Sequence, residues 1–487
     1  MDQALLSSIY SRFIITNKLR KMMFLNKQNL LFNQQILING VNMVTRRQFL
    51  IMAGGAAIII LAGGAAYIAS RSKTTTTTTP VASPITTTTK PKNIGGKIIV
   101  LGRSGYHETI NKNLIDTFLQ KYPNVQVEYV PKGYTDEYQT IVLSQSSRSS
   151  DYDAIYIDEP WIHMMINNGW LLPIDEPDLD GYPEHLKNWP TVGGKTYAQA
   201  ITGNANFLFY REDILKDLGE TPPETWDDVL RIAKKVKEKY TDLGVKIYGF
   251  GAYSVKGTSI AQDTFPAFLY PFGGRYFAED GITPALYSEE AVQALEFFKE
   301  LKNYSHPRMT EFTSLAEYSE AILRGEVAIG VTWNGWIADI DNPQKSNVVG
   351  KINIRPYPRQ KTFFGAQSGV WFYGVSAFST NPDTAMEFVK IATSLPAQKR
   401  AALEAGLPPT RLQVFSDPEY RTKERLADKF LEIIEVVKPV RTNPLWGDMA
   451  EQIGTYLFMG LMGDLPADEA IKKAHDEMVR VTQGVKG

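Results

Sequence analysis

Two acids and an aromatic residue follow a short apolar run, and this combination could bind a small polar molecule. The run Ala154–Ile157 is too short and too apolar for a surface helix, so we predict a buried parallel strand there. Asp158, Glu159 and Trp161 follow it. Carboxylates accept hydrogen bonds, and an indole ring offers a flat apolar face. Because ligands collect beyond the carboxyl ends of strands in open parallel sheets, we predict a binding edge at this turn.

The sequence shows no residue pattern typical of an enzyme or of a metal site. Its five histidines include no pair spaced i, i+4 that could hold zinc, and no G-x-S-x-G sequence occurs. His163 stands alone in an amphipathic stretch, which favours a structural role. We therefore expect no catalytic residue, no metal and no cofactor. A glycosidase remains the enzymatic alternative, because it needs only two acids at a set distance with aromatic residues nearby.

The composition restricts the class of protein. With 487 residues, 43% of them hydrophobic, the chain can bury large cores and should form more than one compact unit. A formal net charge of −1 gives no electrostatic footprint for nucleic acid. The chain contains no cysteine, which excludes disulfides, thiolate metal sites, a cysteine nucleophile and a lipid-modified cysteine anchor.

The N-terminal residues carry the features of an export segment. We assign no fold to residues 1–42, and Met43 is an alternative start of the chain. Residues 43–70 contain Arg46 and Arg47 followed by 23 uncharged residues, in the pattern of a twin-arginine export signal. The uncharged run is long enough to cross a hydrocarbon core of about 30 Å. Two outcomes therefore stay open, a cleaved signal and a retained membrane anchor.

A threonine-rich segment precedes the part of the chain that should fold. Residues 71–95 contain two threonine runs separated by proline-containing spacers, and they predict an extended, solvated stalk. Strands are expected at 97–101 and 125–129, with a helix over 107–122 between them. Together with the strand that ends before Asp158 they form a βαβαβ unit, which predicts a parallel sheet. The turn after the first strand, which contains Arg103, should open on the same sheet edge as Asp158.

Further elements are expected beyond this unit. Apolar residues at helical spacing predict a helix from Trp226, and Thr225 and Asp228 match a helix-start signal. Other expected elements are helices over 289–302 and 316–324, a strand over 326–331 and a helix that Asn381 caps.

Several spaced motifs resemble those of the family 1 extracellular solute-binding proteins, the sugar-capturing subunits of ABC importers. The resemblance covers about residues 97–480. Val370 departs from the pattern because it stands where the family has one of a pair of glycines. The residues that carry the resemblance are Asp153, Asp158, Trp161, Gly169–Leu171, Pro173–Asp175, Tyr210, Arg211, Asp213, Thr332–Trp336, Gly365–Ser376 and Arg441–Pro444.

The resemblance implies an α/β, two-lobed periplasmic-binding-protein-like fold with discontinuous lobes and a central ligand cleft. The first lobe would contain residues 97–205 and 357–379, and the second residues 206–356 and 380–487. The stalk is similar to that of archaeal binding proteins, and we expect the protein at the extracellular face of the cell membrane.

The implied function is to capture a neutral mono- or oligosaccharide and deliver it unchanged to ABC permease subunits. A monomer is expected, with no nucleic-acid partner. An exported glycosidase is the alternative, and a peptide or polyamine binding protein is a further one. Acids and amides would bind sugar hydroxyls, and indoles would stack on the rings. The implied ligand-binding residues are Arg103, Asp158, Glu159, Trp161, Asn204, Trp333, Asn334, Trp336, Gln367 and Trp371.

Overall fold

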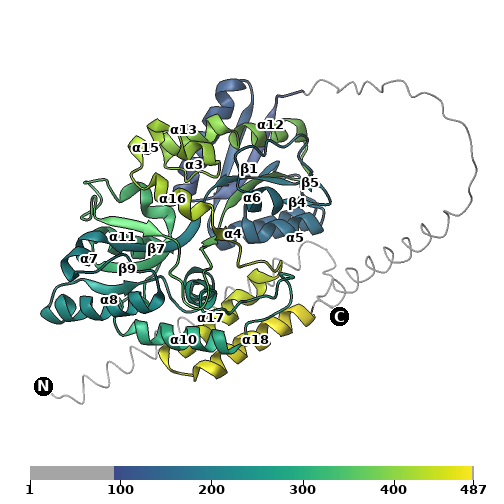
Figure 1. Cartoon of the computed structure of the whole chain (residues 1–487). Coiled ribbons are helices and arrows are strands. Elements are labelled where there is room, and N and C mark those ends of the chain that lie inside the picture. The colour runs from purple at the N-terminus through teal and green to yellow at the C-terminus, as the bar shows by residue number, and fades with distance from the viewer. Residues whose placement is uncertain (1–92, 485–487) are drawn as a thin grey trace, which may run out of the picture. The chain divides into compact units, whose positions relative to one another are not determined.

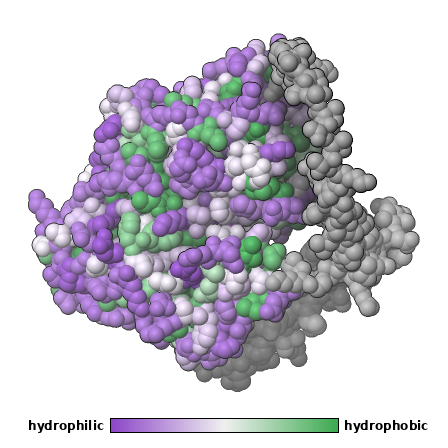
Figure 2. All heavy atoms as spheres, turned by 45° about the vertical axis from the view of Figure 1, so that its right-hand side comes forward, coloured by the Kyte–Doolittle hydropathy of each residue, from purple (hydrophilic) through white to green (hydrophobic). Residues whose placement is uncertain are grey.

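The computed structural model describes residues 93–484. The expected N-terminal extension, the apolar run and all but the last residues of the stalk lie outside this part of the chain. Within residues 93–484, no helix is both long enough and apolar enough to cross a membrane. Figure 2 shows a mostly hydrophilic face over the described residues, with hydrophobic side chains in scattered groups.

The first lobe is built on a five-stranded sheet with the order β2-β1-β3-β12-β6. β1, β2 and β3 run parallel, as the βαβαβ prediction requires, and β12 is antiparallel to both of its neighbours. The predicted parallel sheet is thus confirmed for the first three strands. The strands are β1 (Lys97–Arg103), β2 (Gln126–Lys132), β3 (Ala154–Asp158), β6 (Ala198–Thr202) and β12 (Trp371–Val375).

Helices connect and cover this sheet (Figure 1). The turn after β3 begins as a 3₁₀ turn with Pro160 in its first positions, continues into α5, and ends at Gly169, whose φ is 69°. A short hairpin of β4 (Thr191–Val192) and β5 (Lys195–Thr196) follows α6. The helices are α3 (Tyr106–Lys121), α4 (Tyr134–Ser146), η1 (Glu159–Trp161), α5 (Ile162–Asn167) and α6 (Glu184–Asn188).

The second lobe is built on a sheet with the order β13-β11-β7-β9-β8, and β10 also pairs with β7. Its central strands β7 and β9 are antiparallel and buried throughout. Such strands read as continuous apolar runs because both faces are covered. The strands are β7 (Ala205–Arg211), β8 (Tyr248–Gly251), β9 (Val327–Trp333), β10 (Ile352–Arg355), β11 (Ala366–Ser368) and β13 (Val437–Lys438).

Helices α8, α10, α17 and α18 lie on one side of this second sheet (Figure 1). The predicted helix start at Thr225 is confirmed, since its hydroxyl and the Asp228 carboxylate form a capping box. The helices and turns are α7 (Glu212–Leu218), α8 (Trp226–Lys239), η2 (Thr241–Leu243), η3 (Ile260–Thr264), α9 (Pro266–Leu269), α10 (Glu289–Lys302), α11 (Leu315–Arg324), η4 (Asn334–Asp339), α17 (Trp446–Met462) and α18 (Ala467–Gly484).

The chain after β12 packs with both sheets. α12 and α13 pack against α3 of the first lobe, whereas α16 packs against β7 and β10 of the second. Residues 382–405 thus lie with the first sheet, and β11 pairs with the second, although the sequence analysis assigned each to the opposite lobe. The other boundaries stay predictions. The helices are α12 (Pro382–Ala392), α13 (Leu395–Ala405), α14 (Leu412–Phe415), α15 (Pro418–Lys423) and α16 (Ala427–Ile434).

The expected helix after Asn381 is present, but its side chain makes no cap hydrogen bond. The side-chain nitrogen Nδ2 of Asn381 instead donates to the carbonyl oxygen of Gly95, at 2.7 Å. Thr384 adds a second contact to Gly95 through its hydroxyl, at 2.9 Å. These bonds hold the start of the folded body against α12.

Three segments that run between the lobes are hydrogen-bonded to one another. Gly203 N donates to Pro408 O at 2.7 Å, and Gly369 N donates to Asn204 O at 3.0 Å. A Cβ at position 203 would lie 2.4 Å from the carbonyl oxygen of Pro409, so the close approach requires glycine there. The two lobes are therefore joined by crossing segments whose backbones are hydrogen-bonded to one another.

Candidate ligand-binding cleft

Asp158 is the centre of a buried cluster of polar contacts. It ends β3 and lies opposite Trp371 in the register of β3 and β12. The Tyr134 hydroxyl donates to Asp158 Oδ2 at 2.8 Å, and Arg441 Nη1 donates to the same oxygen at 2.9 Å. The side chains of the ion pair are 4% and 3% exposed, so the pair is shielded from solvent.

Arg441 reaches Asp158 from the second lobe. It follows β13, and the next residues are tied to the loop between α9 and α10 of that lobe. Thr442 Oγ1 donates to Gly281 O at 2.8 Å, and Asn443 Nδ2 donates to Ile282 O at 2.9 Å. Burial opposes the charge of Arg441, but the attraction of Asp158 raises its pKa above the usual value, so it stays charged. The ion pair therefore bridges the two lobes in a closed arrangement.

Aromatic rings surround Asp158 in the first lobe. Trp371 stacks on Tyr156 with a centroid separation of 4.8 Å and an interplanar angle of 17°. Trp161 meets Trp371 edge-on at 5.6 Å, and His107 meets it at 4.9 Å. Trp161 and Trp371 are only 6% and 3% exposed. The wall that they form is therefore continuous with the hydrophobic core of the first lobe.

Arg103 and Glu159 border this wall. The Arg103 guanidinium lies 4.9 Å from the ring centroid of Tyr134 and 5.9 Å from that of Trp371. The Ser368 hydroxyl donates to Glu159 Oε1 at 2.7 Å. Burial raises the pKa of Glu159 to about 7, although the nearby Arg441 charge acts in the opposite direction.

Trp333 forms the facing wall in the second lobe. It ends β9, and its indole Nε1 donates to Asp263 Oδ1 at 2.8 Å. The Arg441 guanidinium lies 5.8 Å from its ring centroid. Asp263 belongs to η3, a π-helical turn, which is a distortion frequent at functional sites. Burial raises the pKa of Asp263 to about 7, against the effect of the Trp333 hydrogen bond.

Amide side chains lie beside Trp333. In the register of the second sheet, Gln367 stands opposite Asn206, and Asn206 stands opposite Trp333, so these three side chains share one row. Neither amide atom of Gln367 has a hydrogen-bond partner, although the residue is fully buried. Oδ1 of Asn204, on the adjoining crossing segment, also lacks one. Buried amides normally have partners, which makes this group of atoms a candidate binding surface.

Two of the implied site residues lie away from this group. Asn334 Nδ2 donates to Gly203 O at 3.2 Å, and Ala205 N donates to Asn334 Oδ1 at 3.3 Å. Asn334 thus braces a crossing segment. Trp336 packs edge-on against Phe209 at 5.5 Å and is 2% exposed, in the core next to β7. The structure brings together the other eight, namely Arg103, Asp158, Glu159, Trp161, Asn204, Trp333, Gln367 and Trp371.

Tyr134, Asp263 and Arg441 were not among the ligand-binding residues that the sequence implied. Asp263 is a single acid within a largely apolar stretch, which is a usable signal for a buried functional acid. Arg441 begins one of the motifs that carried the resemblance, but its partner could not be identified from sequence. Tyr134 begins an ordinary amphipathic helix and gives no such signal.

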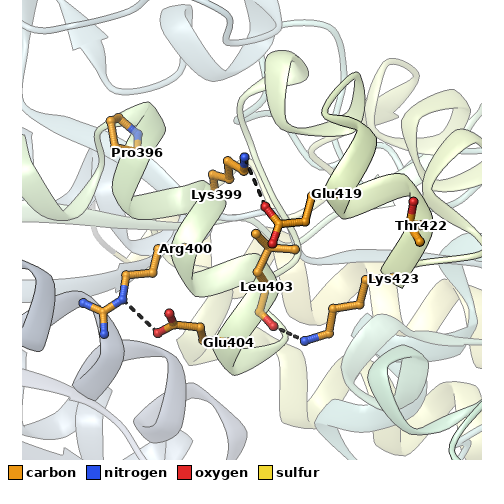
Figure 3. Close-up of a pocket in the computed structure, with 8 residues that line it drawn as sticks. All are labelled: Pro396, Lys399, Arg400, Leu403, Glu404, Glu419, Thr422 and Lys423. Carbon is orange, nitrogen blue, oxygen red and sulfur yellow. Dashed lines mark hydrogen bonds and ion pairs between the residues drawn. The ribbon is translucent and has the colours of Figure 1, made fainter.

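An open pocket of about 790 Å³ lies outside the cleft, between α13 and α15. Its charged side chains are already paired with neighbours (Figure 3): Arg400 Nε donates to Glu404 at 2.8 Å, and Lys399 pairs with Glu419 at 3.4 Å. Within the described residues, no group of acids and histidines is placed to hold a metal ion. The buried polar atoms around Asp158 and Trp333 are therefore the candidate site.

A family model described as "Bacterial extracellular solute-binding protein" matches residues 113–428. The chain belongs to this family. Its members bind solutes outside the cytoplasm and are not enzymes, so the expected family, fold and extracytoplasmic setting are confirmed at that level.

Relatives and solved structures agree with this assignment. A probable amino-acid ABC transporter periplasmic-binding protein from Sinorhizobium fredii is 25% identical over 61% of this chain and 68% of its own length. The mannitol-binding protein of Pseudomonas aeruginosa is 23% identical over 76% of this chain and 91% of its own. Maltose-bound MalE3 of T. maritima matches with a TM-score of 0.71 and 24% identity, over 80% of this chain and all of that one. Such structural neighbours establish the two-lobed fold.

Proposed function

We propose that this solute-binding protein captures a saccharide between its two lobes and delivers it unchanged to ABC permease subunits in the membrane. The observation that carries the proposal is the group of buried polar atoms without partners beside Trp333. Amide groups of this kind donate to and accept from sugar hydroxyls, and each unmet group costs free energy until a ligand satisfies it.

The two walls supply the second requirement of a sugar site, which is a flat apolar face. Trp333 carries such a face from the second lobe, and the ring cluster around Trp371 borders the first. Relatives support the ligand class. Besides the mannitol-binding protein, a solute-binding protein of Thermotoga lettingae with α-D-tagatose bound is 25% identical and covers 80% of this chain, with a TM-score of 0.65.

Capture should involve closure of the lobes about the crossing segments. The Asp158–Arg441 pair forms only when the two walls meet, and the bonded backbones at Gly203 and Gly369 are where a hinge would bend. A ligand shifts such an equilibrium only by its preference for the closed form. Ligand contacts from both lobes therefore belong to the mechanism.

The setting follows from the N-terminal residues. We propose that the twin-arginine pattern in residues 43–70 directs export, and that the apolar run is either cleaved or kept as an anchor. In the second case the threonine-rich stalk holds a monomeric binding domain beside its permease. Mass spectrometry of the mature protein would distinguish the two, because cleavage removes the apolar run from the N-terminus.

Calorimetric titration with mono-, di- and oligosaccharides tests the proposed function. We expect saturable binding of at least one sugar, and weaker binding of that sugar by the Gln367→Ala variant. Arg359→Gln is the matched control, since this exposed arginine lies outside the cleft. Turnover of a bound sugar would favour the glycosidase alternative. If only peptides, amino acids or polyamines bind, the saccharide proposal is wrong.

A further inference from the structure

Arg103 is a cation without an ionic partner at the edge of the cleft. It ends β1, and its guanidinium lies against the rings of Tyr134 and Trp371, at 4.9 and 5.9 Å from their centroids. Its Nη1 atom is buried and has no hydrogen-bond partner. Among residues 93–484, no carboxylate forms an ion pair with it.

The other charged groups of the cleft are already paired. Asp158 is bound to Arg441 at 2.9 Å, so neither compensates Arg103. Glu159 accepts the Ser368 hydroxyl, and Asp263 accepts the Trp333 indole. Asp158 and Arg441 thus compensate each other, and neither is paired with Arg103.

Burial weakens the ionisation of the remaining acids. Burial raises the pKa of Glu159 and of Asp263 to about 7, so at neutral pH each is partly protonated. Glu137 is fully buried in α4, and burial raises its pKa well above the usual value, although the nearby Arg103 charge acts in the opposite direction. None of these acids forms an ion pair with Arg103 within the described residues.

We propose that the bound saccharide carries an anionic group, a carboxylate or a phosphate, and that Arg103 binds this group. This inference rests on the proposed function. A neutral sugar would leave the partly buried Arg103 guanidinium without a counter-charge, which is unfavourable. A carboxylate or phosphate supplies that charge, and the planar guanidinium can bind it through two parallel hydrogen bonds. This differs from the neutral saccharide expected from the sequence, for which Arg103 would donate to ring or hydroxyl oxygens.

Calorimetric titration with matched ligands tests this specificity. One series is galactose, galacturonate and galactose 6-phosphate, and the other is glucose, glucuronate and glucose 6-phosphate. In wild-type protein, we expect one anionic form to bind about ten- to a hundredfold more tightly than the neutral sugar of its series. Comparison of the uronate with the 6-phosphate in each series shows whether the protein prefers a carboxylate or a phosphate.

Variants assign the preference to Arg103. In Arg103→Gln, the ratio of anionic to neutral affinity should fall to about one, whereas Arg103→Lys should keep part of it because the charge remains. The exposed Arg359→Gln variant should keep the wild-type ratio. Neutral sugars that bind as tightly as both anionic forms, or a preference that survives in Arg103→Gln, would overturn the inference but leave saccharide binding intact. If no anionic sugar of either series binds more tightly than its neutral parent, the inference is overturned, whereas the proposed function is overturned only if the full panel of mono-, di- and oligosaccharides fails to bind.

Discussion

The two walls of the cleft hold their tryptophans by different contacts. In the first lobe, Trp371 and Trp161 pack ring against ring, and Tyr156 stacks beneath Trp371. In the second lobe, Trp333 is fixed by a hydrogen bond to buried Asp263. The same residue type thus belongs to a hydrophobic core on one side and to a buried polar cluster on the other. Substitutions should therefore cost stability at the first wall and affinity at the second.

The largest expected effect is the loss of stability in Trp371→Ala. Removing this indole leaves a cavity among Tyr156, His107 and Trp161, which should lower the free energy of unfolding by about 3–5 kcal/mol. Urea unfolding measures the change, and Trp371→Phe should lose less because a ring remains. A loss below about 1 kcal/mol would show that the first wall is not part of the core.

The next effect concerns the ion pair that joins the walls. Arg441→Gln leaves Asp158 buried without its counter-charge when the lobes close, so solute affinity should fall by about 2–3 kcal/mol in binding free energy. Titration of the Asp158→Asn and Arg441→Gln single and double variants gives the coupling energy. If the two single losses simply add, the pair does not act across the closed cleft.

A smaller effect is expected for Trp333→Ala. If the indole stacks on a sugar ring, its loss should weaken binding by about 1–3 kcal/mol, or about one to two decades in affinity. Thermal unfolding should change less than in Trp371→Ala, because a polar contact rather than a ring cluster holds this side chain. Lost stability with unchanged affinity would instead assign Trp333 to the core.

A further effect is a pH dependence of binding, whose size depends on how much of each pKa difference the open form retains. In the closed structure, burial raises the pKa of Glu159 and Asp263 to about 7, whereas open lobes should return both to about 4. Between these values the closed form holds more protons, so closure becomes less favourable as pH rises from about 4 to 7. Each unit of pKa difference between the open and the closed form changes the free energy of binding by about 1.4 kcal/mol, which is about tenfold in affinity.

A neutral sugar should therefore bind more tightly at pH 5 than at pH 8. The charges of Arg441 and Asp158 act on both acids, and Arg441 stays charged across this range. Asp263→Asn should reduce the slope. Equal affinity at both pH values would contradict the expected uptake of protons on closure.

The sequence predicted those parts of the fold that local patterns determine. The strand before Asp158 and the helix from Trp226 follow from apolar periodicity and from turn residues, which act within a few positions. The assignment of 382–405 to the second lobe failed because it depends on which sheet α12 and α13 pack against. That choice is made by contacts far apart in sequence.

The sequence likewise predicted only those parts of the site that local patterns or the family resemblance indicate. The turn at Asp158 was predicted from the end of a strand, and Trp333 was implied by the family resemblance. Whether each residue binds ligand remains a prediction. Arg441 joins Asp158 across 283 positions of the chain, and no local signal reports such a pair. Burial of an acid such as Asp263, which sets its pKa, is likewise a property of packing from several elements.

The central claim is that the walls close on a solute, and a distance between the lobes tests it most directly. The chain has no cysteine, so Leu143→Cys in α4 and Ile282→Cys beside the Arg441 segment introduce two unique labelling sites, both on exposed side chains. Spin labels at these sites report the separation of the lobes with and without a saturating sugar. The account predicts one shorter and narrower distance when sugar is bound. An unchanged distance distribution at saturation would contradict it.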